Sequence, residues 1–165
     1  MEPGKRWLVM AGLLTALASV VHVGIVLGGP DWYRAFGAGE RMARLAAQGS
    51  AYPLVVTLGI AAVLGGWALY ALSGAGVIRR LPLVRFVLAS AAAVFLARGL
   101  FGIPVVLMTN ASYAHELRNR MTFMIVSSAV CTGLGLCYAL GVRSVSSPTN
   151  RSTRAQRAVA RSAER

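Results

Sequence analysis

The sequence predicts an all-α integral membrane protein: an antiparallel four-helix bundle with a short interfacial helix in its first outer loop. Three stretches contain no Asp, Glu, Lys or Arg over 22 residues or more, namely Trp7–Pro30, Leu45–Ile78 and Met121–Val142. Each reaches the roughly 20 residues that a helix needs to cross a bilayer core. A fourth apolar stretch, Leu81 to about Val106, is interrupted mainly by Arg98. Hydrophobic residues make up 56% of the chain, which leaves too few polar residues to cover a water-soluble core.

The first expected span covers about residues 7–27. The basic start, the apolar run and the small residues Ala16-Leu17-Ala18 also have the form of a signal peptide. However, the apolar run continues to Leu27, beyond the roughly 7–15 residues of a signal-peptide core. We therefore expect an uncleaved first span that ends at Gly28-Gly29-Pro30.

The first outer loop, residues 29–51, contains the expected interfacial helix, roughly Trp32–Gln48. Asp31 is placed to cap its start and Gly49 to end it. Its apolar side chains would lie on the outer leaflet while its arginines face water or phosphates. The internal Gly37-Ala38-Gly39 weakens this helix and favours a kink or two short pieces.

The remaining spans follow from the same apolar runs and their breaks. The second covers about 53–72, beginning at Pro53 and ending before Ser73-Gly74-Ala75-Gly76. The third covers about 82–104, where Gly102 and Pro104 end or kink it, and the fourth covers about 121–140, capped by Gly141. Residues 1–142 thus form one transmembrane domain.

Residues 143–165 form a basic tail rich in Ser, Arg and Ala, for which we expect disorder. As an alternative, its regularly spaced arginines could lie along anionic lipid headgroups.

The basic residues predict that both termini are cytoplasmic. In this orientation 11 of the 17 basic residues lie inside and five lie in the outer loops, which follows the positive-inside bias. Membrane topology therefore accounts for the net charge of +12 better than nucleic-acid binding does. A chain this rich in Ala, Gly, Val and Arg favours a bacterial source, so we expect a multi-pass protein of the bacterial inner membrane.

One layer in the outer half of the expected bundle contains polar side chains from every span. The ligand-binding candidates in this layer are His22, Thr57, Arg98, Ser127 and Ser128. A charge at membrane depth costs about 2.5–3.5 kcal/mol on insertion scales, so Arg98 calls for a partner. The outer loop offers Asp31 and Glu40 as counter-ions, of which Glu40 is favoured and is the sixth candidate, and an anionic headgroup is the alternative partner.

Structural roles are the alternative for this layer. If the third span ends at Gly102, Arg98 lies about one turn deep and its side chain reaches the phosphates. His22 would then be a histidine that serves helix packing.

Cys131 and Cys137 are separated by roughly 9 Å along one expected helix, which is too far for a disulfide. Two cysteines and two histidines, widely scattered, predict no metal site and no cofactor.

Three functions follow as hypotheses. The leading one is a non-catalytic membrane protein that binds a lipid or another amphipathic ligand in the outer half of the bundle. The alternative is an accessory or assembly subunit that meets a membrane partner, or a second copy of itself, through small residues at helical spacing. These pairs are Gly24/Gly28, Ala61/Gly65, Ala62/Gly66, Ala93/Ala97 and Ala129/Gly133. The third is a small membrane enzyme that uses His22 as a base and Arg98 to stabilise charge.

Two segments resemble parts of small, uncharacterised four-span bacterial inner-membrane proteins. They are WYRAFGAGE at residues 32–40 and ALYALSGAG at residues 68–76, the latter followed by RRLPL at 79–83. The resemblance implies a four-span topology and a bacterial origin, and it implies no activity and no site residues.

Overall fold

The computed structural model describes residues 3–108 and 121–146, and all regular secondary structure within these ranges is helical. The helices are α1 (Pro3–Ala35), α2 (Glu40–Ala47), α3 (Ala51–Ala75), α4 (Val84–Met108) and α6 (Met121–Ser146). All of these except α2 are long and apolar enough to cross a membrane. The described part of the chain is therefore all-helical, and its four long apolar helices indicate a multi-pass membrane protein. Most of the second outer loop and of the basic tail lies outside the described residues.

A sharp kink divides α1 near its end. Gly29 adopts φ 68° and ψ −155°, a conformation that glycine tolerates far better than other residues. Pro30 follows and opens the next helical turn, where its missing N–H costs little. The break that the sequence predicts at Gly28-Gly29-Pro30 is therefore a change of direction, and the helix resumes as far as Ala35.

The glycine pair Gly24/Gly28 receives a side chain from beyond this kink. A Cβ on Gly28 would overlap the Trp32 indole, and one on Gly24 would touch the edge of the same ring. In this structure the motif therefore accommodates Trp32 of the same helix.

The loop helix expected over Trp32–Gln48 is divided in the structure. Its first residues belong to the end of α1, and α2 begins only at Glu40. Gly37 and Gly39 separate the two with φ of 75° and 89°, so the break falls at the expected glycines. Asp31 was expected to cap this helix, but it lies inside α1 because the helix resumes before it.

A compact turn connects α3 to α4. Ser50 caps the start of α3 by accepting a hydrogen bond from the backbone N–H of Tyr52, and Gly76 ends the helix with a left-handed φ of 79°. The Ser73 hydroxyl donates to the Arg79 carbonyl and accepts from the Leu81 N–H, at 3.0 and 2.9 Å. These bonds fold the turn back onto α3, which ends three residues beyond the expected Leu72.

Two helix ends differ from the sequence predictions. Pro104 neither ends nor breaks the third span, because α4 continues through it to Met108. A proline removes a single helical hydrogen bond, and apolar surroundings penalise unwound backbone far more. Gly141 does not cap the fourth span, since α6 continues to Ser146. A Cβ on Gly141 would overlap Leu8, so this glycine allows α1 and α6 to approach closely.

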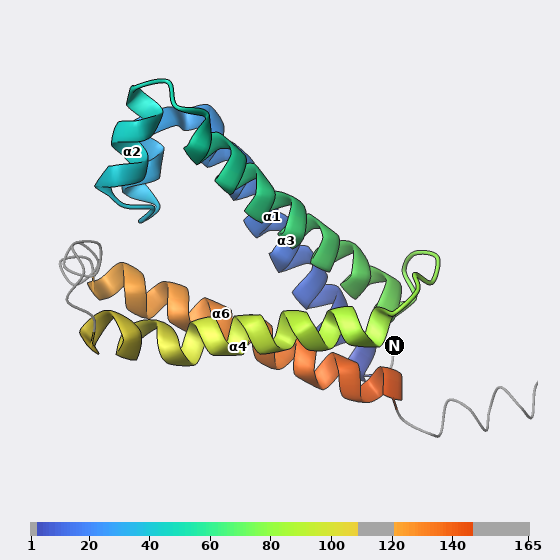
Figure 1. Cartoon of the computed structure of the whole chain (residues 1–165). Coiled ribbons are helices and arrows are strands. Elements are labelled where there is room, and N and C mark those ends of the chain that lie inside the picture. Colours follow the sequence, from blue (N-terminus) through green and yellow to red (C-terminus); the bar gives the residue numbers. More distant parts are fainter. Residues whose placement is uncertain (1–2, 109–120, 147–165) are drawn as a thin grey trace, which may run out of the picture.

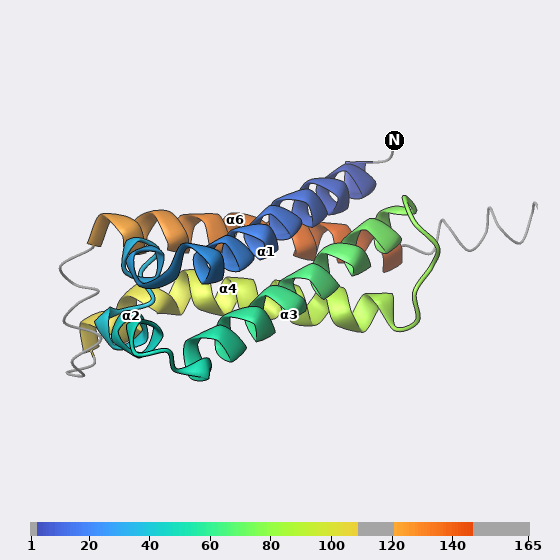
Figure 2. The same cartoon turned by 90° about the horizontal axis from the view of Figure 1, so that it is seen from above.

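The long helices form two pairs, α1 with α3 and α4 with α6 (Figure 1). The start of α1, the end of α3, the start of α4 and the end of α6 lie together at one end of the molecule. From this end the two pairs diverge, and α2 lies at the opposite end beside the kinked part of α1 (Figures 1 and 2).

The main core fills the end at which the pairs meet. Leu8, Leu88 and Tyr138 are fully buried there, and the Tyr138 hydroxyl donates to the Thr15 hydroxyl at 3.1 Å. Phe95 stacks on Tyr138 with 5.8 Å between ring centroids and also contacts Trp67. This aromatic cluster ties the two pairs together, and nothing comparable joins them at the α2 end among the described residues.

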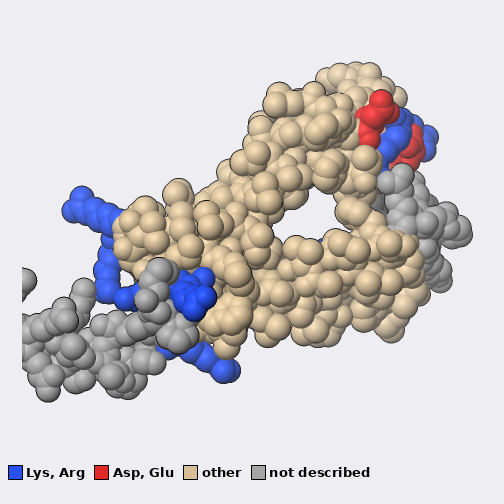
Figure 3. Space-filling view, turned by 180° about the vertical axis from the view of Figure 1, so that it is seen from behind, with Lys and Arg blue, Asp and Glu red and all other residues tan. Residues whose placement is uncertain are grey.

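Charged side chains gather at the two ends of the described structure (Figure 3). Of the described charged residues, only lysine and arginine lie at the end where the pairs meet, whereas the α2 end holds the acidic residues together with Arg34, Arg41 and Arg44. The basic group comprises Lys5, Arg6, Arg79, Arg80, Arg85 and Arg143. The length between these ends is the part of the molecule suited to a hydrocarbon core.

Candidate ligand-binding site

A cavity of about 1060 Å³ occupies the space between the diverging helix pairs. Its walls come from α1, α3, α4 and α6, together with Phe36 and Gly37 from the turn before α2. In the space-filling view it is an opening that passes between the two pairs (Figure 3). Most lining side chains are aliphatic or aromatic, and four carry a more polar group: His22, Arg98, Ser127 and Cys131.

The cavity exists because its two walls are assembled separately. On one side, the Ser19 hydroxyl donates to the Ala61 carbonyl at 2.8 Å and joins α1 to α3. On the other, Gly99 and Gly135 bring α4 and α6 together, since a Cβ on either would come within 3 Å of the facing helix's backbone. Small residues thus close each pair internally, and the space between the pairs remains open.

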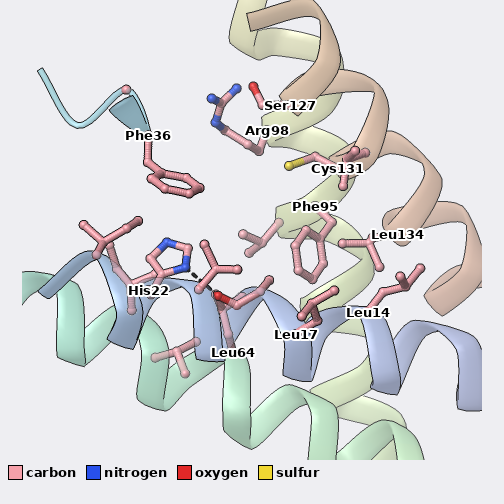
Figure 4. Close-up of a pocket in the computed structure, with 18 of the residues that line it drawn as sticks. Leu14, Leu17, His22, Phe36, Leu64, Phe95, Arg98, Ser127, Cys131 and Leu134 are labelled. Atoms are coloured by element: carbon pink, nitrogen blue, oxygen red, sulfur yellow. Dashed lines mark hydrogen bonds between the residues drawn. The ribbon is translucent and has the colours of Figure 1, made fainter. Parts of the chain in front are cut away.

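The α2 end of the cavity is closed by a contact between Gly37 and Phe123 of α6. A Cβ on Gly37 would lie 2.5 Å from the Phe123 ring, so only glycine permits this approach. Phe36, the preceding residue, projects towards the cavity (Figure 4) and stacks on Trp32 with 5.7 Å between ring centroids. The segment from Pro30 to α2 therefore lies over this end of the cavity.

Arg98 lies on the α4 wall of the cavity, and its side chain is exposed. About 15 Å of helix separates it from Met108 at the end of α4, because this helix does not end at Gly102. Within residues 3–108 and 121–146 its guanidinium has no ion pair and no hydrogen bond. The guanidinium packs over Gly102, where a Cβ would overlap Nη1.

The expected pairing of Glu40 with Arg98 does not form in this structure. Glu40 instead accepts hydrogen bonds from Arg34 Nε and Nη2 at 2.9 and 3.2 Å, and Arg44 Nε lies 3.5 Å away. The hydrogen bond from Arg34 lowers the pKa of the Glu40 carboxyl from its ordinary value. The contact of Arg34 with Glu40 links the kinked end of α1 to α2, and Arg34 also donates to Asp31 of its own helix at 2.9 Å.

His22 faces the cavity from α1, opposite Arg98 (Figure 4). Its Nδ1 lies 2.8 Å from the Ala18 carbonyl oxygen. Because a carbonyl only accepts hydrogen bonds, Nδ1 carries the proton, and the other ring nitrogen points into the cavity.

The four remaining polar positions divide between the cavity and the helix contacts. Ser127 and Cys131 line the cavity on α6, and the Ser127 hydroxyl donates to the Met124 carbonyl at 3.2 Å. Thr57 and Ser128 are buried outside the lining. The Ser128 hydroxyl has no hydrogen-bond partner in the described structure.

The cavity therefore brings together three of the six predicted candidates, His22, Arg98 and Ser127. Sequence reasoning missed Phe36, Gly102, Phe123 and Cys131. The spacing of Gly102 offered a signal, since it follows Arg98 by one helical turn and leaves room for the long side chain.

No group of three or more His, Cys, Asp or Glu side chains suited to a metal ion occurs in the described ranges. Comparisons of the chain with protein-family models, with curated proteins and with solved structures found no match.

Proposed function

We propose that this protein is a non-catalytic, multi-pass membrane protein whose antiparallel bundle holds a lipid or another amphipathic ligand. One observation carries the proposal: a large, mostly apolar cavity between the helix pairs has on its wall an arginine, Arg98, that pairs with no residue of the described ranges. Its volume of about 1060 Å³ matches the upper end of ligand pockets, which measure about 300–1,000 Å³.

The bilayer is the natural source of an occupant. The cavity opens sideways between the helix pairs, where acyl chains surround a membrane protein (Figure 3). An acyl chain satisfies the aliphatic walls, and an anionic headgroup satisfies Arg98, whose desolvation otherwise costs about 2.5–3.5 kcal/mol. The segment from Pro30 to α2 covers the end of the cavity as a lid.

The location follows from the charges. We place the basic end in the cytoplasm and the α2 end outside, which puts both termini inside and the cavity in the outer half of a bacterial inner membrane. In this orientation α2 lies at the outer membrane interface, with Arg41 and Arg44 exposed to headgroups.

Replacing Arg98 tests this function. Native mass spectrometry of the full chain, released from its own membrane in mild detergent, should show a co-purifying amphipathic molecule. Arg98→Leu should reduce its occupancy at least tenfold, and Arg98→Lys should restore it only in part because an ammonium lacks the planar donor fork. Arg85→Leu is the matched control, since Arg85 is exposed on the same helix outside the cavity. Equal occupancy in all four proteins would contradict the proposal.

Exposed small residues favour a second candidate, an accessory or assembly subunit. Ala93, Ala97, Ala129 and Gly133 are exposed on α4 and α6, so these two pairs do not serve contacts within the described chain. Ala61 and Gly65, by contrast, face Ser19 of α1. Crosslinking through cysteines at positions 93 and 129 in the native membrane should then trap a partner or a second copy. A monodisperse monomer with no crosslinked product would remove this candidate. No described contact favours the enzyme hypothesis for His22 and Arg98.

A further inference from the structure

The two walls of the cavity present opposite hydrogen-bonding chemistry. The Nδ1–H of His22 is engaged by the Ala18 carbonyl at 2.8 Å, so neutral His22 offers Nε2 to the cavity as an acceptor. Arg98 offers only donors from the other wall. A ligand that satisfies both must combine an anionic group with a separate hydrogen-bond donor.

The charges of the side chains that line the cavity decide whether that donor can itself be charged. No acidic side chain lines the cavity among the described residues, whereas Arg98 contributes a full positive charge. An ammonium donor, as in phosphatidylethanolamine, would be repelled by this charge, and the described lining offers no second anion besides the phosphate that Arg98 engages. A fatty acid would supply the anion but leave Nε2 without a donor. An uncharged hydroxyl fits both conditions.

We infer that the ligand of this cavity is an anionic phospholipid whose headgroup carries an uncharged hydroxyl, as in phosphatidylglycerol. The inference rests on the proposed function and names its ligand class. The phosphate lies at Arg98, a headgroup hydroxyl donates to Nε2 of His22, and the acyl chains lie against the aliphatic walls.

A matched pair of lipids tests the hydroxyl. Phosphatidylglycerol and phosphatidylethanol with identical acyl chains are both singly charged phosphodiesters, and only the first has headgroup hydroxyls. The full chain in detergent is titrated with each lipid. Phosphatidylglycerol should bind about fivefold more tightly, which corresponds to one net hydrogen bond of about 1 kcal/mol. Phosphatidylethanolamine should bind more weakly than either.

Cys131 provides the readout because it lines the same cavity. In a Cys137→Ala variant, lipid in the cavity should slow the alkylation of Cys131 by a maleimide, whereas lipid on the outer surface should not. Apparent affinities are taken from this protection.

His22 variants assign the preference to its ring. His22→Phe should bring the two phosphodiesters to equal affinity, and His22→Gln, which retains an acceptor, should restore part of the difference. Unchanged binding of phosphatidylethanol by His22→Phe shows that the variant is folded.

The outcomes separate the two claims. If the wild-type protein binds both phosphodiesters equally and both protect Cys131, or if His22→Phe keeps the preference, the hydroxyl inference is wrong while the proposed function stands. If none of the lipids protects Cys131 and no amphipathic molecule co-purifies with the wild-type protein, the proposed function itself is contradicted.

Discussion

Gly102 sets the position of Arg98 by lacking a side chain. The Arg98 guanidinium lies over it, in the space that a Cβ would fill. An arginine at this depth is costly unless it faces a cavity or a partner, so the residue that orients it affects binding without touching the ligand.

Gly102→Ala tests this role. The new Cβ would overlap Arg98 Nη1, and the flexible side chain would move aside while the helix stays intact. We expect stability to hold or rise, since alanine favours a helix by about 1 kcal/mol over glycine, and retention of the anionic ligand to fall several-fold. Thermal unfolding and native mass spectrometry measure the two effects. Gly133→Ala is the control, because no atom lies within 4 Å of its added Cβ. Unchanged ligand retention in Gly102→Ala would argue against this role.

The Arg34–Glu40 pair gives the lid a dependence on pH. The pKa of Glu40 is lowered in the folded protein below its ordinary value of 4.5. The stability that the pair adds to the folded state is therefore fully present above pH 4.5. It is lost as pH falls through the lower folded pKa. The contribution is small because both groups meet solvent. Hydrogen exchange of α2 should increase on acidification in the wild type more than in Glu40→Gln. An equal response in both proteins would remove the pair as the cause.

At the scale of the helices, close glycine contacts hold α4 and α6 together. Gly99 allows α4 to pack closely on α6. A Cβ added at Gly99 would lie only 2.7 Å from the backbone nitrogen of Thr132. Backbone cannot move aside as a side-chain end can, so these two helices form one rigid wall.

Gly99→Ala should therefore destabilise the protein by about 1–3 kcal/mol, the usual cost of overpacking. Gly66→Ala on α3 should have little effect, since nothing lies within 4 Å of its added Cβ. Unfolding in detergent mixtures compares the two variants. Equal stability of both would show that α4 and α6 are not packed this closely.

The length of the apolar runs predicted the four long helices, three of them from charge-free stretches and the fourth despite Arg98, because a hydrocarbon core demands a minimum length. Their ends were harder to predict. Pro104 and Gly141 carry the usual signs of helix termination, yet both lie inside helices because apolar packing outweighs local preference. Gly29, in contrast, follows its local preference and kinks α1.

At the scale of the molecule, the arrangement of the helix pairs decides which polar residues meet. Depth along each span placed His22, Arg98 and Ser127 in one layer, and all three line the cavity. Thr57 and Ser128 belong to the same predicted layer but lie outside the lining, since depth says nothing about which way a residue faces. The sequence could not predict the partner of Glu40 either, because this contact depends on the kink that brings Arg34 to α2.

Orientation in the membrane is tested by single cysteines in a background without Cys131 and Cys137. We expect Ala38→Cys, before α2, to react with an impermeant reagent added outside the cell. Val77→Cys, exposed in the turn after α3, should react only after the membrane is opened. Labelling of Val77→Cys from outside the cell, with Ala38→Cys protected until the membrane is opened, would show that the proposed topology is wrong.

The divergence of the two helix pairs also gives the molecule unequal cross-sections at its two ends (Figure 1). Where Leu8 and Tyr138 pack together, the bundle takes up little membrane area, and where the lid lies it takes up more (Figure 1). A molecule that is wider at one end fits best in a membrane that curves so that the leaflet around the wide end is stretched. In a membrane, the protein should gather where the bilayer is curved towards its α2 end. A ligand in the cavity should keep the α2 end wide, whereas an empty cavity should let the two helix pairs move together.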